Sequence, residues 1–115
     1  GQAVTITPSA TSSKVLVTLD YTTDTFNDNT VYSVQLVRGS TAIGNAANGN
    51  QMIHMNANEY DTGGFTFLDS PSTTSATTYK LQFKSFDGGA LSFNRSQSSS
   101  TFQTASNITV IEIGA

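Results

Sequence analysis

The chain has 115 residues, a formal net charge of −3 at pH 7 and only 11% charged residues. This length predicts one domain, residues 1–115, with a modest core. The low charge and the abundance of Ser, Thr, Asn and Gly argue against a charge-rich helical domain and favour an all-β domain with polar turns. The negative charge gives no electrostatic reason to bind nucleic acid or an anionic membrane. No apolar run approaches the roughly 18 residues of a transmembrane helix, and the absence of cysteine excludes disulfides and thiolate sites.

The first half of the chain contains segments in which apolar and polar residues alternate, as expected of half-buried strands. The predicted strands of this half are Ala3–Thr7, Ser13–Tyr21, Val31–Arg38 and Thr41–Ile43. Pro8 stops the first of them because proline cannot donate to a sheet ladder. Thr22–Thr30 reads as a polar loop, and Gly39-Ser40 as the turn of a hairpin.

The second half begins with a long polar segment, Gly44–Gly63, which we expect to be irregular apart from a brief strand at Gln51–Met55. The two clearest strands follow at Gly64–Leu68 and Tyr79–Phe86, and Pro71 lies in the connection between them. Their alternating aromatic and aliphatic residues predict the centre of the sheet core.

A tight turn at Asp87-Gly88-Gly89 predicts a hairpin from Phe86 to a strand at Ala90–Arg95. A short strand at Thr101–Gln103 and a final strand at Ile108–Ile113 complete the chain. The final strand is apolar on both faces, which indicates that a partner covers part of the surface. About eight to ten short strands without a helical period predict a sandwich or barrel-like fold.

Catalytic and metal-binding patterns are weak in this sequence. His54 is the one histidine, no nucleophile elbow is present, and nothing selects Asp61 and Asp69 as the acid and base of a glycosidase. We therefore expect no enzymatic activity, no metal and no cofactor. The oxygen-rich stretch Asp24–Asn29 lacks the spacing of an EF-hand, so an Asx-stabilised turn is favoured over a calcium site, although the sequence leaves that question open.

Polar recognition through the long loop is the remaining possibility. Loops on a rigid scaffold commonly carry binding residues, and this one offers amide, imidazole, phenol and carboxylate groups. The candidate receptor-binding residues are His54, Asn56, Asn58, Tyr60 and Asp61. The alternative is a plain solvent-exposed connection.

Five fragments occur in an order that resembles a known family. They are Thr7–Val17, Val37–Ile43, Phe67–Tyr79, Asn94–Ser96 and Ile108–Ile113. The chain resembles the C-terminal head domains of tail-fibre and appendage proteins of aquatic bacteriophages and some large algal viruses. This resemblance spans nearly the whole chain.

The resemblance implies an antiparallel jelly-roll β-sandwich, similar to tumour-necrosis-factor and complement-C1q heads. It also implies a homotrimer at the tip of a fibre on the virion, outside the cell, where it contacts host surface glycan or protein. The start at Gly1 fits the C-terminal fragment of a longer fibrous protein whose shaft precedes this domain. A trimer would supply the cover for the second apolar faces. No binding residue is carried over from the family.

Two other hypotheses remain open at this point. One is a structural domain that trimerises, caps or decorates the appendage and touches no receptor. The other is a depolymerase acting on surface polysaccharide, for which Asp61 or Asp69 would have to be essential.

Overall fold

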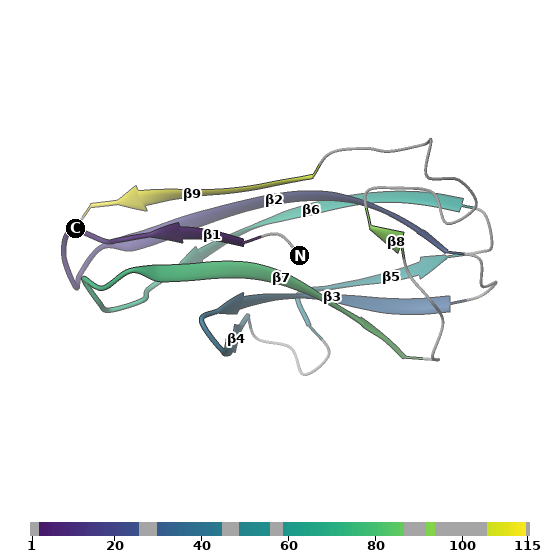
Figure 1. The fold of residues 1–115 in the computed structure, drawn as a ribbon, viewed down its shortest axis with the longest axis horizontal. Coiled ribbons are helices and arrows are strands. Elements are labelled where there is room, and N and C mark those ends of the chain that lie inside the picture. Colours follow the sequence, from purple (N-terminus) through teal and green to yellow (C-terminus); the bar gives the residue numbers. More distant parts are fainter. Residues whose placement is uncertain are drawn as a thin grey trace.

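The computed structural model describes residues 3–25, 30–44, 49–55, 59–86, 92–93 and 106–114. These residues form nine strands in two antiparallel sheets that lie face to face (Figure 1). Among them, no helix is long and apolar enough to cross a membrane. The prediction of an all-β antiparallel domain with about eight to ten strands is confirmed for this part of the chain.

The larger sheet is centred on β3 (Thr30–Arg38) and is called the β3 sheet. Its other strands are β1 (Ala3–Ile6), β7 (Thr77–Ser85), β4 (Thr41–Ile43) and β5 (Gln51–Met55). β7 lies between β1 and β3, while β4 and β5 share the other edge of β3. All of these strands were predicted within one or two residues of their bounds.

The smaller sheet is centred on β2 (Lys14–Thr25) and is called the β2 sheet. Its other strands are β6 (Glu59–Asp69), β8 (Ser92–Phe93) and β9 (Asn107–Ile113). β6 pairs with β2 along one edge over its full length. β9 and β8 follow one another along the other edge.

The hydrophobic core fills the space between the two sheets. Its buried members alternate with exposed residues along the strands, as the pleat requires. They are Val15, Val17, Leu19, Tyr21, Tyr32, Val34, Leu36, Ile43, Met55, Tyr79 and Leu81. Phe65, Phe67 and Phe83 are partly buried against this cluster. Phe65, Phe67, Tyr79 and Phe83 of the two clearest predicted strands therefore contribute to the core between the sheets, whereas Phe86 is exposed.

Two segments predicted as loops are strand, which makes β2 and β6 longer than expected. β2 continues to Thr25, and β6 begins at Glu59 instead of at Gly64. The register places Thr23 opposite Asp61, and the Thr23 side chain is completely buried. Polar composition alone suggested loops here, but β-branched threonines fit a strand when a partner strand covers them.

The predicted hairpin after Phe86 is wrong in its pairing. β8 pairs with Thr23 and Asp24 of β2, so it belongs to the sheet opposite β7. β9 covers β2 only up to Asp20, and the free edge beyond that point accepts β8. The turn Asp87-Gly88-Gly89, most of Ala90–Arg95 and the strand expected at 101–103 lie outside the described residues.

Asn50 completes the edge of β3 between β4 and β5. Its backbone N–H donates to the Val34 carbonyl at 2.7 Å, and its Oδ1 accepts from the Leu36 N–H at 2.8 Å. The Gln35 amide also donates to the Asn50 Oδ1 at 2.9 Å. The side chain and the backbone N–H of Asn50 thus satisfy the two β3 backbone groups with which a continuous neighbouring strand would otherwise pair.

Candidate functional site

The structure does not bring the predicted binding residues together on one face. His54 lies on β5 opposite Val31, with its side chain exposed. Tyr60 and Asp61 lie on β6 in the other sheet, and neighbouring residues of a strand point to opposite faces. Asp61 stands opposite the buried Thr23, which leaves the exposed Tyr60 on the outer face of the β2 sheet. Asn56 and Asn58 lie outside the described residues.

A mixed polar and apolar surface instead surrounds His54 on the outer face of the β3 sheet. We call it the outer patch. Its members are Val31, Met52, His54, Lys84 and Phe86. His54 stands opposite Val31, and the Phe86 N–H donates to the Val31 carbonyl at 3.0 Å from the other side. Met52 and Lys84 flank Ser33 in the adjacent row.

The outer patch exposes large side chains of different chemistry at one place. Met52 is 59% exposed and Phe86 is 42% exposed. The Lys84 ammonium lies 5.1 Å from the centroid of the Phe86 ring, within the range of a cation–π interaction. A thioether, an aromatic ring, an imidazole and a cation can together cover an apolar face of a ligand and hydrogen-bond to its polar groups.

Sequence reasoning found only part of this surface. It selected His54 from the loop composition and expected a strand at Tyr79–Phe86, which contains Lys84 and Phe86. It did not join the two, because the pairing of β5 and β7 with opposite edges of β3 is a long-range feature. The available signal was the alternation of Ile53 and Met55, which places Met52 and His54 together on the opposite face of a strand.

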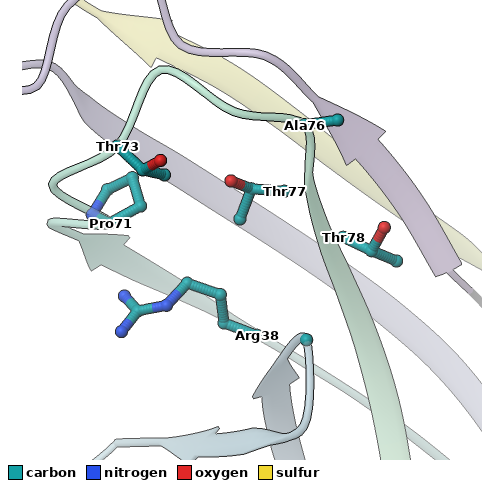
Figure 2. Close-up of a pocket in the computed structure, with 7 residues that line it drawn as sticks. Arg38, Pro71, Thr73, Ala76, Thr77 and Thr78 are labelled. Carbon is teal, nitrogen blue, oxygen red and sulfur yellow. The ribbon is translucent and has the colours of Figure 1, made fainter.

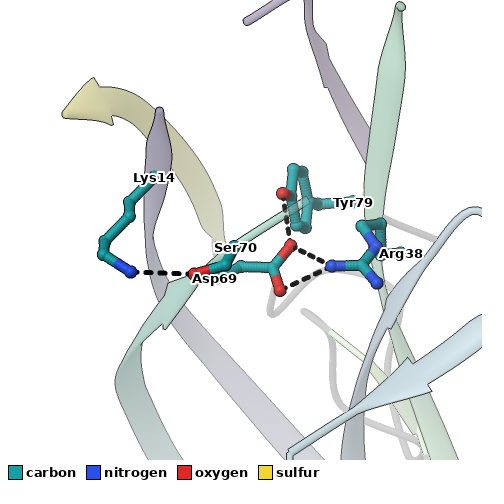
Figure 3. Close-up of polar contacts among 5 residues, drawn as sticks. All are labelled: Lys14, Arg38, Asp69, Ser70 and Tyr79. Carbon is teal, nitrogen blue, oxygen red and sulfur yellow. Dashed lines mark hydrogen bonds and ion pairs between the residues drawn. The ribbon is translucent and has the colours of Figure 1, made fainter. Parts of the chain in front are cut away.

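A polar cluster lies at the other end of the sandwich, nearer the C-terminus (Figure 3). The Arg38 Nη1 contacts both oxygens of Asp69 at 2.7 Å, and the Tyr79 hydroxyl donates to the Asp69 Oδ2 at 2.7 Å. Burial raises the pKa of Tyr79, and the hydrogen bond to the Asp69 carboxylate raises it further. Because Asp69 belongs to β6 and its two partners to β3 and β7, the cluster fastens the two sheets together.

This arrangement bears on the pair of acids considered for a depolymerase. Asp69 is buried and engaged by Arg38 and Tyr79. Asp61 lies eight residues away on the same strand, which is roughly 26 Å at the rise of an extended chain. The two carboxyl groups of a glycosidase are within about 10 Å of each other, so these two residues cannot form such a pair.

A cavity of about 320 Å³ lies beside the polar cluster (Figure 2). It is lined by Arg38, Gly39, Pro71, Thr73, Ala76, Thr77 and Thr78. Its hydroxyls are largely committed within the protein. Thr77 donates to the Ser75 carbonyl at 2.9 Å, and the Thr73 Oγ1 accepts from the Ser75 N–H at 3.1 Å. The cavity therefore offers a ligand few free polar groups apart from the Arg38 guanidinium.

In the described segments, no three His, Cys, Asp or Glu side chains gather as a metal site would require. Most of the Asp24–Asn29 stretch lies outside these segments, while Asp24 itself is a buried member of β2.

Comparison with known proteins assigns no family to the chain. No protein-family model matches it, and no curated protein matches its sequence. The functional proposal therefore depends on the sequence resemblance and on the geometry of the outer patch.

Proposed function

We propose that this domain is the receptor-binding head of a viral tail fibre or appendage, which recognises host cell-surface glycan or protein as a homotrimer. The observation that carries the proposal is the outer patch, where Met52, His54 and Phe86 are exposed on a rigid sheet. Exposed apolar side chains that group on one surface commonly mark a binding site. The head would sit on the virion, outside the cell, on a shaft formed by the same protein.

The position of the patch supports this proposal. β5 and the C-terminal end of β7 lie at the end of the sandwich opposite the C-terminus (Figure 1). The strands hold the side chains in fixed positions, so binding would require little ordering of the protein.

The narrower fold assignment, a jelly roll like those of tumour-necrosis-factor and complement-C1q heads, stays part of the proposal. Two antiparallel sheets joined by crossings between them are compatible with it. The observed order is β1-β7-β3-β4, with β5 also beside β3, and β6-β2-β8, with β9 also beside β2. A solved relative that shares this order would support the assignment, and a relative with another order would remove it.

The alternative is a structural domain that trimerises or caps the appendage without binding a receptor. The exposure of Leu68 and Ile111 on the outer face of the β2 sheet suits assembly, which both functions require. The two functions differ in what happens when the outer patch is changed while assembly is left intact.

The deciding experiment replaces Met52 and Phe86 by alanine together and measures adsorption of the purified protein to host cells and to a glycan array. Binding should weaken at least about tenfold, or about 1.4 kcal/mol, because truncating an anchor residue at the centre of an interface costs about 2 kcal/mol or more. Gln82→Ala, on the same face of β7 but outside the patch, is the matched control. Unchanged adsorption by the double variant would favour the structural alternative.

A further inference from the structure

Charge is divided unequally between the two sheets. The five strands of the β3 sheet contain Arg38, Lys80 and Lys84 but no aspartate or glutamate. The strands of the β2 sheet contain one cation, Lys14, and six of the eight acidic residues of the chain. These acids are Asp20, Asp24, Glu59, Asp61, Asp69 and Glu112. The net charge of −3 therefore describes neither sheet, because the strands of the β3 sheet are basic.

Two of these cations, Lys80 and Lys84, lie on the outer face of β7. Alternate residues of a strand share a face, and the core residue Tyr79 takes the inner one. Lys84 is exposed, and Lys80 is half-buried between Ala3 of β1 and Val37 of β3. A lysine stem that covers apolar neighbours commonly keeps its ammonium in water.

The two lysines of β7 also differ from the other described cations in having no counter-charge. The Arg38 guanidinium forms an ion pair at 2.7 Å with a carboxylate of β6, and the Lys14 ammonium donates to the Ser70 hydroxyl at 2.9 Å. Lys80 forms no ion pair or hydrogen bond within the described residues. The Lys84 ammonium lies against an aromatic ring, which leaves its charge uncompensated. The outer face of the β3 sheet thus carries positive charge that an acidic ligand can neutralise.

We propose that the outer face of the β3 sheet binds an acidic polysaccharide that lies along β7 from Lys80 to Phe86. The inference rests on the proposed receptor-binding function and names the class of its ligand. Lys80 and Lys84 are four residues apart, which is about 13 Å at the rise of a strand. Sulfate or carboxylate groups that recur along an extended sugar chain can reach both ammonium groups, whereas a neutral glycan gains nothing from them.

The outer patch supplies the apolar part of this site. Phe86 follows Lys84 on the same face, about 7 Å further along the strand, and it is 42% exposed. Met52 stands in the same row as Lys84, on the other side of Ser33. The apolar face of a sugar ring can pack against the aromatic ring and the thioether while its acidic group meets the Lys84 ammonium.

Other polyanions fit this face less well. Nucleic-acid binding draws its affinity from many phosphate contacts, and two lysines supply few. An extended acidic peptide gains affinity by pairing its main chain with the edge of a sheet, but β7 lies between β1 and β3 and has no open edge there. A sugar polymer needs only the side chains that the face presents.

The first test measures binding of the purified protein to three polymers by biolayer interferometry. Dextran sulfate carries sulfate groups, alginate carries carboxylates, and dextran carries no charge. At least one of the two acidic polymers should bind and dextran should not. The affinity should fall as NaCl is raised from about 50 to about 300 mM, because salt screens exposed charges. Polyglutamate is included as the acidic peptide.

The second test changes the lysines. Lys80→Gln should weaken binding to the acidic polysaccharide about threefold, and Lys80→Gln with Lys84→Gln about tenfold, as expected of exposed ion pairs. Lys14→Gln makes the same change in net charge on the other sheet and should leave binding unchanged. Gln82→Ala leaves both lysines in place and should change binding less than Lys80→Gln. Far-UV circular dichroism checks that each variant is folded.

Several results would overturn the inference. They are no binding to either acidic polysaccharide, equal binding to dextran, an equal loss in Lys14→Gln, and tighter binding to polyglutamate than to both acidic polysaccharides. Host adsorption separates the inference from the proposed function. If the wild-type protein and the Lys80/Lys84 double variant adsorb equally well to host cells, only the inference fails. If the wild-type protein binds an acidic polysaccharide but adsorbs to no host cell, the proposed function fails and the binding surface stands.

Discussion

The cluster of Arg38, Asp69 and Tyr79 should behave as a clamp between the two sheets, which a double-mutant cycle can measure. The Asp69 side chain is only 7% exposed and the Arg38 side chain 29% exposed. Removing one partner of a buried ion pair costs about 3–5 kcal/mol, because the other charge is left without compensation. Since water reaches part of Arg38, we expect the lower end, about 3 kcal/mol of unfolding free energy, for Arg38→Met.

The second arm of the cycle is Asp69→Asn, which keeps the shape of the side chain and an acceptor for the Tyr79 hydroxyl. We expect it to cost about 2 kcal/mol, and the double substitution to cost about 3 kcal/mol instead of the sum of the two. The coupling free energy between the residues is then about 2 kcal/mol. In thermal unfolding, the Arg38→Met change corresponds to a fall in Tm of roughly 10–15 °C.

The assay is urea unfolding followed by circular dichroism at a fixed protein concentration, because assembly contributes to the apparent stability. Lys80→Met, which removes another cation from the same sheet, is the control and should change the unfolding free energy by less than about 0.5 kcal/mol. A coupling free energy below about 0.5 kcal/mol would refute the clamp and leave the cluster as a surface contact.

Three further predictions concern other contacts. Burial, with a contribution from the charge of Asp61, raises the pKa of Tyr21 from 10.0 to about 12. The unfolded chain therefore loses this proton first, and stability should fall as the pH rises from 10 through 12; a flat unfolding free energy over that range would contradict this. Gly63→Ala would place a Cβ 2.5 Å from the Tyr21 hydroxyl and should cost about 1–3 kcal/mol in urea unfolding. Because the ring carbon Cζ of Tyr21 lies 2.6 Å from the same Cβ, Tyr21→Phe should recover little of that loss, and full recovery would show that the hydroxyl alone is the obstacle. Hydrogen bonds from the Ser9 hydroxyl and N–H lower the pKa of Glu112, so Ser9→Ala should raise it in an NMR titration; an unchanged value would argue against the contact.

The strands that sequence reasoning located are those whose signal is local. The alternation in Val15, Val17 and Leu19 follows from burying one face of a pleated strand, and it is visible without knowledge of any partner. The same reasoning stopped β2 at Tyr21, because the following threonines and aspartate resemble a loop in composition. Only the pairing of Thr23 with Asp61, across a long register with β6, makes that stretch a strand.

The candidate site was harder to predict for the same reason. The residues selected from one loop were close in sequence, but strand alternation and the crossing from β5 to β6 place His54 and Tyr60 on opposite sides of the sandwich. The Arg38–Asp69 contact joins positions 31 residues apart. Nothing in the local sequence around either residue distinguishes a buried clamp from an ordinary surface charge.

Asn50 has a consequence for how this protein can change over time. The backbone N–H and the side chain of Asn50 hydrogen-bond to β3 in the gap between β4 and β5. The edge of β3 is therefore hydrogen-bonded both where the chain leaves β4 and where it enters β5. A longer connection between these two anchored ends would then cost little, since the entropy of closing a loop rises only slowly with its length. Natural variation, or a designed insertion, would find at this point a site where a new binding loop can be added without redesigning the scaffold.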